Sequence, residues 1–124
     1  MQPKIARETG AVVRVTEDVV GKRVVNLAGE DVGEIKEIVI EGKAGRVTYA
    51  ILSFGGFLGM GDKLFAVPWG SLSYERTNDV YMMKVDKELL KNAPGFDKNN
   101  WPDMSDPARI AEIYRYYGTD PYWP

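Results

Sequence analysis

The most informative pattern of hydrophobic positions lies between Arg46 and Phe54. Alternate residues of a strand point to opposite faces. Both sets are apolar here: Val47, Tyr49 and Ile51 on one face, and Ala50, Leu52 and Phe54 on the other. A strand that is apolar on both faces lies centrally and is covered on both sides. We therefore expect a closed or nearly closed barrel on one side of this strand and a further element on the other.

Short segments rich in β-branched and aromatic residues surround this strand, with turn residues between them. They predict strands over residues 22–27, 32–41, 64–67, 72–74 and 80–85. Residues 42–45 have the length and composition of a hairpin connection, and Gly33 is a predicted bulge. Before these strands, residues 11–15 form a short strand or pack as an arm. Strands at this spacing predict a mainly β fold, a small antiparallel barrel or sandwich.

Two helices are predicted after the strands. Asp86 is a suitable N-cap for a short helix over residues 87–92. Asp106 and Pro107 favour the start of a second helix, because Asp caps helices and Pro suits their first position. Gly118 ends it.

The second helix has one apolar stripe, because four residues fall at i, i+3, i+4 and i+7: Ile110, Ile113, Tyr114 and Tyr117. A helix of about three turns is marginally stable alone. The stripe must therefore pack on the barrel or on a second copy of the chain, and it is the expected cover for the outer face of the central strand.

The composition changes at about Ala93. Seven of the aromatic residues follow it: Phe96, Trp101, Tyr114, Tyr116, Tyr117, Tyr122 and Trp123. Disordered segments are poor in aromatics, so this part is expected to be ordered. We divide the chain into a lead-in (residues 1–16), a barrel domain (17–91) and a C-terminal extension (92–124) with its helix at about 107–117.

Composition narrows the function. The chain has 124 residues, of which 44% are hydrophobic, enough for one domain with a modest core. The net charge of −2 without long charged runs argues against a dedicated nucleic-acid binder. The absence of cysteine and histidine excludes disulfides and thiolate chemistry and removes the commonest general base and metal ligand. The apolar runs are far shorter than the roughly 20 residues that span a bilayer, and the N-terminus lacks a signal-peptide core. We expect a cytoplasmic protein, and peripheral association with a membrane complex stays open.

Residues 55–62 form a glycine-studded loop with a bulky apolar tip, Phe57, Leu58 and Met60. A phosphate loop has its glycines between a strand and a helix. A strand follows here instead, so we interpret the loop as a structural corner in which glycine supplies positive φ. The three apolar side chains either plug the barrel or form a contact patch. Contact with a partner is the preferred alternative.

Carboxylates gather before and within the long predicted strand 32–41: Glu30, Asp31, Glu34, Glu37 and Glu41. The spacing is not that of a calcium loop, and nothing marks a cleft for a pair of glycosidase acids. A solvated face is the favoured interpretation, and we expect no catalytic residue, metal or cofactor. The tail aromatics could stack on sugars or bases, but without a basic groove packing or dimerisation is favoured. The candidate interaction surface comprises Phe57, Leu58, Met60, Trp101, Tyr114, Tyr117, Tyr122 and Trp123.

An ordered series of segments, Gly29–Ile35, Gly45–Leu52, Gly55–Lys63 and Ala66–Trp69, resembles the PRC-barrel family over about residues 17–91. The family is named from the cytoplasmic domain of the H subunit of the purple-bacterial photosynthetic reaction centre. The tail resembles extensions of bacterial stand-alone members. The resemblance implies a small β-barrel without a known active site, used for interaction or assembly. Relatives include the C-terminal domain of a ribosome-maturation factor that binds a ribosomal protein. The chain lacks the transmembrane helix of the H subunit and the N-terminal domain of that factor, so neither role transfers.

We therefore expect a non-enzymatic protein-interaction or assembly module that self-associates as a homodimer and binds a protein partner still unknown. The alternative is an accessory protein associated with RNA or the ribosome, or one that binds a small ligand. Nucleic acid is the less favoured partner because no basic groove accompanies the aromatics.

Overall fold

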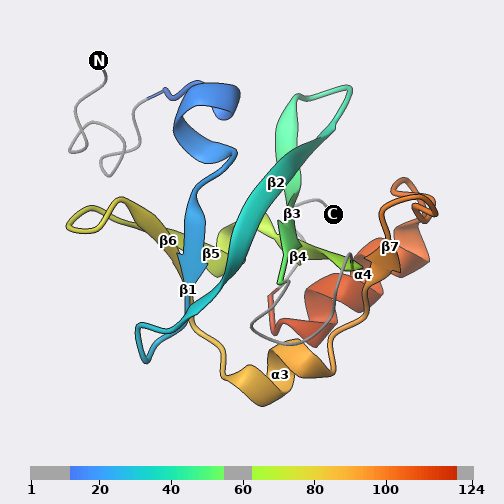
Figure 1. Cartoon of the computed structure of the whole chain (residues 1–124). Coiled ribbons are helices and arrows are strands. Elements are labelled where there is room, and N and C mark those ends of the chain that lie inside the picture. Colours follow the sequence, from blue (N-terminus) through green and yellow to red (C-terminus); the bar gives the residue numbers. More distant parts are fainter. Residues whose placement is uncertain (1–11, 55–62, 120–124) are drawn as a thin grey trace.

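The fold is a single sheet with helices at its ends and over one face (Figure 1). The computed structural model describes residues 12–54 and 63–119. The strands are β1 (Arg23–Val25), β2 (Asp31–Glu41), β3 (Arg46–Ser53), β4 (Lys63–Pro68), β5 (Leu72–Glu75), β6 (Val80–Met83) and β7 (Phe96–Asp97). The helical elements are the π-helix η1 (Val15–Val19), the 3-10 helix η2 (Trp69–Ser71), and the α-helices α3 (Lys87–Lys91) and α4 (Pro107–Tyr116).

The seven strands are ordered β5-β6-β1-β2-β3-β4-β7. All neighbours are antiparallel except β1 and β6, which run parallel. The prediction of an antiparallel barrel is therefore corrected to a mixed sheet that is not closed, because within residues 12–54 and 63–119 no pairing joins β5 to β7. One physical reason is β7, a strand of the extension that the sequence pattern did not predict. It pairs with Lys63 and Leu64 and so occupies part of the outer edge of β4.

The central hairpin agrees with the sequence prediction. β2 and β3 pair antiparallel across the connection at residues 42–45, and Gly45 adopts a φ of 74°, which glycine tolerates best. The carboxylate of Glu41 accepts hydrogen bonds from the backbone N–H groups of Lys43 (2.9 Å) and Ala44 (2.6 Å). The pairing of β1 with β2 shifts register beside Gly33, which confirms the predicted bulge.

Both faces of β3 are buried, as predicted. On one face Ala50, Leu52 and Phe54 belong to the larger core, together with Phe65 and Val67 of β4 and residues of β1, β2, β6 and α3. The stripe of α4 packs on the opposite face of β3. The smaller core there consists of Tyr49, Ile51, Ala66, Ile113 and Tyr114. The extension therefore supplies the cover that a small sheet cannot provide for its own second face.

Local capping rules position both α-helices. The Asp86 carboxylate accepts a hydrogen bond from Leu89 N (2.9 Å) at the start of α3. Asp106 accepts one from Ala108 N (3.0 Å) at the start of α4. Gly118 follows α4 with a φ of 68°, the left-handed conformation that ends helices. Residues 12–14 form no strand, and Val13 packs against the larger core as an arm before η1.

Candidate interaction surfaces

Five of the predicted contact residues lie outside the described part of the chain. They are Phe57, Leu58 and Met60 of the glycine loop and Tyr122 and Trp123 of the tail. Whether the glycine loop plugs the fold or meets a partner stays a prediction.

The other three candidates pack within the chain. Tyr114 is 3% exposed, and its hydroxyl donates a hydrogen bond to the backbone oxygen of Thr48 (2.6 Å). Trp101 packs on Phe96 with ring centroids 4.8 Å apart, and its Nε1 donates to the Lys98 oxygen (3.0 Å). Tyr117 is half-buried and contacts both cores. The aromatic residues of the described extension therefore serve mainly to attach α4 and β7 to the sheet.

Among the described residues, two buried tyrosine hydroxyls have no hydrogen-bond partner: that of Tyr49 on β3 and that of Tyr117 at the C-terminal end of α4. Burial raises the pKa of the Tyr49 hydroxyl above its ordinary value of 10.0, and the nearby Tyr114 raises it further. Burial also raises the pKa of Tyr117, with a smaller contribution from Tyr116. Both groups are thus held in their neutral form, and the fold depends on their staying so.

We expect the protein to lose stability in alkaline solution and the change Tyr49→Phe to weaken that loss. The unfolded chain releases the tyrosine protons near pH 10, whereas the folded chain retains them to higher pH. The ionisation of these tyrosines leaves the free energy of unfolding unchanged below about pH 10 and lowers it above that pH by up to about 1.4 kcal/mol per pH unit for each tyrosine. Guanidinium unfolding at about pH 7 and about pH 11 measures the effect.

Tyr49→Phe also removes a buried hydroxyl that has no partner, so at neutral pH it should raise the free energy of unfolding by about 1 kcal/mol. A variant with lower stability at neutral pH and an unchanged alkaline loss would contradict this account of Tyr49.

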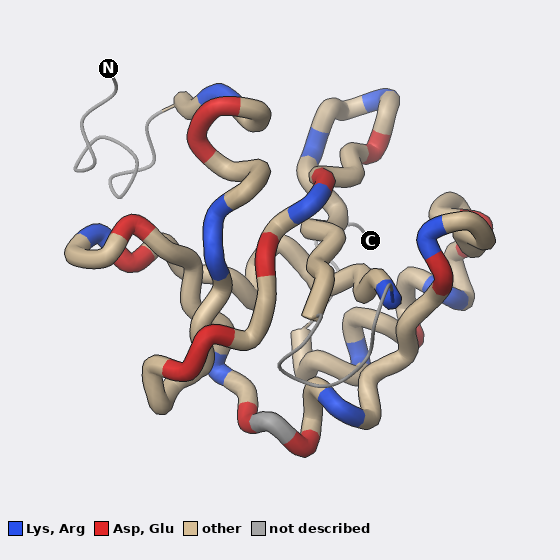
Figure 2. Tube along the Cα trace, viewed as in Figure 1, with Lys and Arg blue, Asp and Glu red and all other residues tan. Residues whose placement is uncertain are grey.

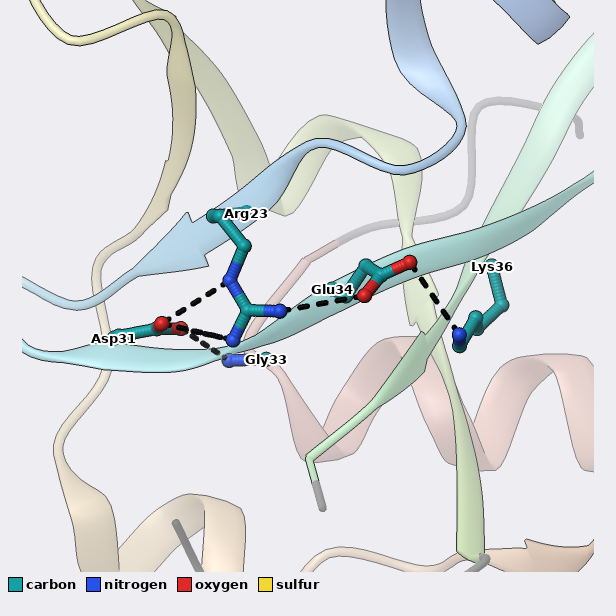
Figure 3. Close-up of polar contacts among 5 residues, drawn as sticks. All are labelled: Arg23, Asp31, Gly33, Glu34 and Lys36. Carbon is teal, nitrogen blue, oxygen red and sulfur yellow. Dashed lines mark hydrogen bonds and ion pairs between the residues drawn. The ribbon is translucent and has the colours of Figure 1, made fainter. Parts of the chain in front are cut away.

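Two carboxylates of the predicted series, Asp31 and Glu34, form ion pairs on the surface of the sheet (Figure 3). Arg23 on β1 contacts Asp31 (2.7 Å) and Glu34 (3.3 Å) on β2, and Lys36 contacts Glu34 (3.3 Å). The hydrogen bond to Asp31 raises the pKa of Arg23. These pairs are about half exposed, so each contributes only about 0–1 kcal/mol. Among the residues described, no group of three or more acidic, histidine or cysteine side chains is arranged to hold a metal ion.

The β2–β3 hairpin projects beyond the rest of the sheet (Figure 1), and we call its residues 37–48 the hairpin arm. The strand pairings of β2 with β1 end at Glu34, and those of β3 with β4 begin at Tyr49. Ile40 on the arm is 55% exposed. Ile38, Val39 and Val47 are only half-buried. Ile38 packs partly against the larger core and Val39 against the smaller core, so these two lie on opposite faces of the hairpin. The apolar surface that the described residues leave least covered is therefore the cross-strand pair of Ile40 and Val47.

Leu27 is a further exposed apolar residue, and it lies on the turn between β1 and β2. We call residues 26–30 the Leu27 turn. The buried side chain of Asn26 accepts hydrogen bonds from the N–H groups of Ala28 and Glu30, both at 3.0 Å. Its Nδ2 donates to the Glu30 carboxylate (2.9 Å). Gly29 completes the turn with a φ of 80°. Leu27 at the centre of this fixed turn is 64% exposed.

The Leu27 turn borders an open groove of about 580 Å³ on the side of α3. Its lining residues are Asn26, Leu27, Ala28, Glu30, Lys84, Val85, Asp86 and Glu88. Three carboxylates and one ammonium group surround the apolar side chains of Leu27 and Val85. Sequence reasoning missed this site because Leu27 ended a predicted strand. The only signal was the turn chemistry of residues 26–30, which does not tell where a leucine points.

None of the described helices has the length and apolar character needed to cross a membrane. A search of curated proteins gives no match. A family model, described as the PRC-barrel domain, matches residues 16–90. The match extends from η1 through α3, includes the hairpin arm and the Leu27 turn, and ends before β7 and α4. Because it covers more than half of the chain, the protein belongs to the PRC-barrel domain family.

Proposed function

We propose that the protein is a non-enzymatic protein-interaction module that self-associates through the hairpin arm. The observation that carries this proposal is the exposure of Ile40 (55%) beside its half-buried cross-strand partner Val47. Further along β3, residues 49–52 are completely buried. A second copy packed on the arm would remove the same β-branched surface from water on both chains, at roughly 25 cal/mol per Å² of apolar area.

The contacts that the carboxylates make support a non-enzymatic function. Asp86 and Asp106 cap helices, and Glu41 and Glu75 accept backbone N–H groups in hairpin turns. Asp31 and Asp79 pair with Arg23 and Lys22. The pKa of Glu41 and that of Glu75 are lowered by their backbone hydrogen bonds. These are the signs of structural groups, since a general acid at neutral pH needs a raised pKa.

No observation on the described surface favours the RNA-associated alternative. Figure 2 shows Lys and Arg interspersed with Asp and Glu rather than gathered in a stripe. The groove beside Leu27 has three carboxylates, which repel phosphates. Protein is therefore the partner class that the charges support best.

The change Ile40→Lys tests self-association. Leu27→Lys is the matched control, because Leu27 is also an exposed apolar residue and lies outside the hairpin arm. We expect the sedimentation mass of the wild type to rise toward a dimer with concentration. Ile40→Lys should weaken the dimer at least about tenfold, or 1.4 kcal/mol, because it places a charge in the contact. Leu27→Lys should dimerise like the wild type, and all three chains should have similar unfolding temperatures.

A wild-type chain that stays monomeric at protein concentrations up to about 1 mM would overturn the self-association. Equal weakening of the dimer by both variants would show that the contact does not lie on the arm.

A further inference from the structure

The Leu27 turn and its groove have no part in the proposed dimer contact, and we infer that they form a docking site for a basic segment of a partner protein. The segment is a short stretch of chain with Lys or Arg side chains next to an apolar one. This inference rests on the proposal that the protein is an interaction module, and it adds the place and the chemistry of the partner.

The first argument is that Leu27 is held outward by a fixed turn. The backbone of Asn26 donates to the Glu30 oxygen (3.0 Å), and Gly29 N donates to the Asn26 oxygen (3.0 Å). These bonds add to those made by the Asn26 side chain. A leucine on such a turn needs little further ordering when it meets a partner, so less entropy opposes binding. Leu27 therefore has the properties of an apolar anchor at an interface.

The second argument is the charge around the groove. Glu30, Asp86 and Glu88 lie in its lining with a single cation, Lys84. Glu30 and Asp86 stay in place through their bonds to Asn26 and to the start of α3. Opposite charges across an interface steer association and select partners. The excess of carboxylates selects a cationic segment and disfavours RNA and anionic lipid surfaces.

The third argument combines the two. The apolar side chains of Leu27 and Val85 lie within the same groove as the carboxylates. A ligand that was only cationic would leave Leu27 exposed to water. A ligand that was only apolar would remove water from the carboxylates and offer them no charged partner in exchange. A segment with both kinds of side chain satisfies both parts of the groove.

The test uses the full chain labelled with ¹⁵N and a capped peptide of alternating lysine and leucine. A second peptide, with glutamate in place of each lysine, is the control. We expect the lysine peptide to shift the amide signals of Leu27, Ala28 and Val85 in a saturable manner and the glutamate peptide to leave them unchanged. Leu27→Lys and Glu88→Lys should each raise the Kd at least tenfold. Glu112→Lys makes the same charge change on exposed α4, so it should bind like the wild type.

Leu27→Ser and Glu88→Gln are milder variants that keep the test valid if the lysine changes disturb folding. They should still weaken binding measurably. An absence of shifts at the three amides, or equal weakening by Glu112→Lys, would overturn the inference. The same amide shifts with a single-stranded RNA oligonucleotide or with anionic phosphatidylserine vesicles would overturn the choice of a basic protein segment.

The two proposals fail separately. If the lysine peptide leaves the groove signals unchanged while Ile40→Lys still abolishes a wild-type dimer, the groove inference is wrong and the proposed function stands. If the peptide binds with the expected variant pattern while the wild type remains monomeric, the groove inference holds and self-association through the arm is wrong.

Discussion

Replacing Tyr114 with alanine is expected to lower the free energy of unfolding by about 3–5 kcal/mol. The ring is 3% exposed and packs against Tyr49 with ring centroids 5.8 Å apart. Its loss would leave a cavity between α4 and the outer face of β3, and the Thr48 oxygen would lose the hydroxyl that contacts it at 2.6 Å. Because α4 supplies the cover for that face, the loss should weaken the whole fold. Urea unfolding, followed by circular dichroism, measures it.

Two matched variants separate the parts of this effect. Tyr114→Phe keeps the ring and removes only the hydroxyl, so we expect a cost of about 1 kcal/mol. Glu112→Ala changes an exposed position on the same helix and should stay within about 0.5 kcal/mol of the wild type. A similarly small effect of Tyr114→Ala would show that the ring is not docked on the sheet.

The elements that were predictable from sequence depend on local chemistry. Asp106 and Gly118 act within a few residues of the helix that they delimit, so the ends of α4 could be predicted from the residues themselves. The stripe containing Ile113 and Tyr114 was equally clear, because helical periodicity places those side chains on one face. The need for a cover on both faces of β3 followed from its two apolar sets. Each of these predictions required no knowledge of which strands are neighbours.

The strand order could not be obtained in this way. The parallel pairing of Val24 with Tyr81 joins segments far apart in the chain, and an alternating pattern fits a parallel or an antiparallel neighbour equally well. Strand β7 has only two residues, too short for any periodicity. Closure of the sheet was therefore an expectation from the family resemblance and from the need to cover one face of β3. The structure covers that face with the larger core, to which β1, β6 and α3 contribute, without a pairing of β5 with β7 among the described residues.

The candidate surface was predictable only in its composition. Aromatic residues fill cores and interfaces alike. Of the three described candidates, Tyr114 is buried, whereas Trp101 and Tyr117 are half-buried and contact the chain's own residues. For Leu27 and Ile40 the sequence pattern did not predict their exposure. They looked like ordinary strand residues, and their exposure depends on the Asn26 turn and on the point where strand pairing ends. Exposure of an apolar side chain is a property of the tertiary structure, which a single sequence does not display.

Among the glycines of the described strands and turns, Gly33 is the one where a single added methyl group should disturb the sheet most. It lies at the bulge of β2, in the interior. A Cβ atom at this position would lie 2.4 Å from the backbone oxygen of Ser53 and 3.0 Å from Cδ1 of Phe54. The first neighbour is backbone, which cannot turn away as a flexible side chain would. The second belongs to the stacked Phe54–Phe65 pair, whose centroids are 4.4 Å apart in the larger core.

Gly33→Ala should therefore lower the free energy of unfolding by about 2–3 kcal/mol, the upper part of the range for overpacking a core. Gly42→Ala is the matched control, because a Cβ at Gly42 meets nothing within 4 Å. It should be neutral or stabilise by up to about 1 kcal/mol, since alanine restricts the unfolded chain. Thermal and urea unfolding of both variants give the comparison. Equal tolerance of both alanines would contradict this account. It would mean that the backbone of Ser53 does not approach Gly33 closely enough to require glycine at this position.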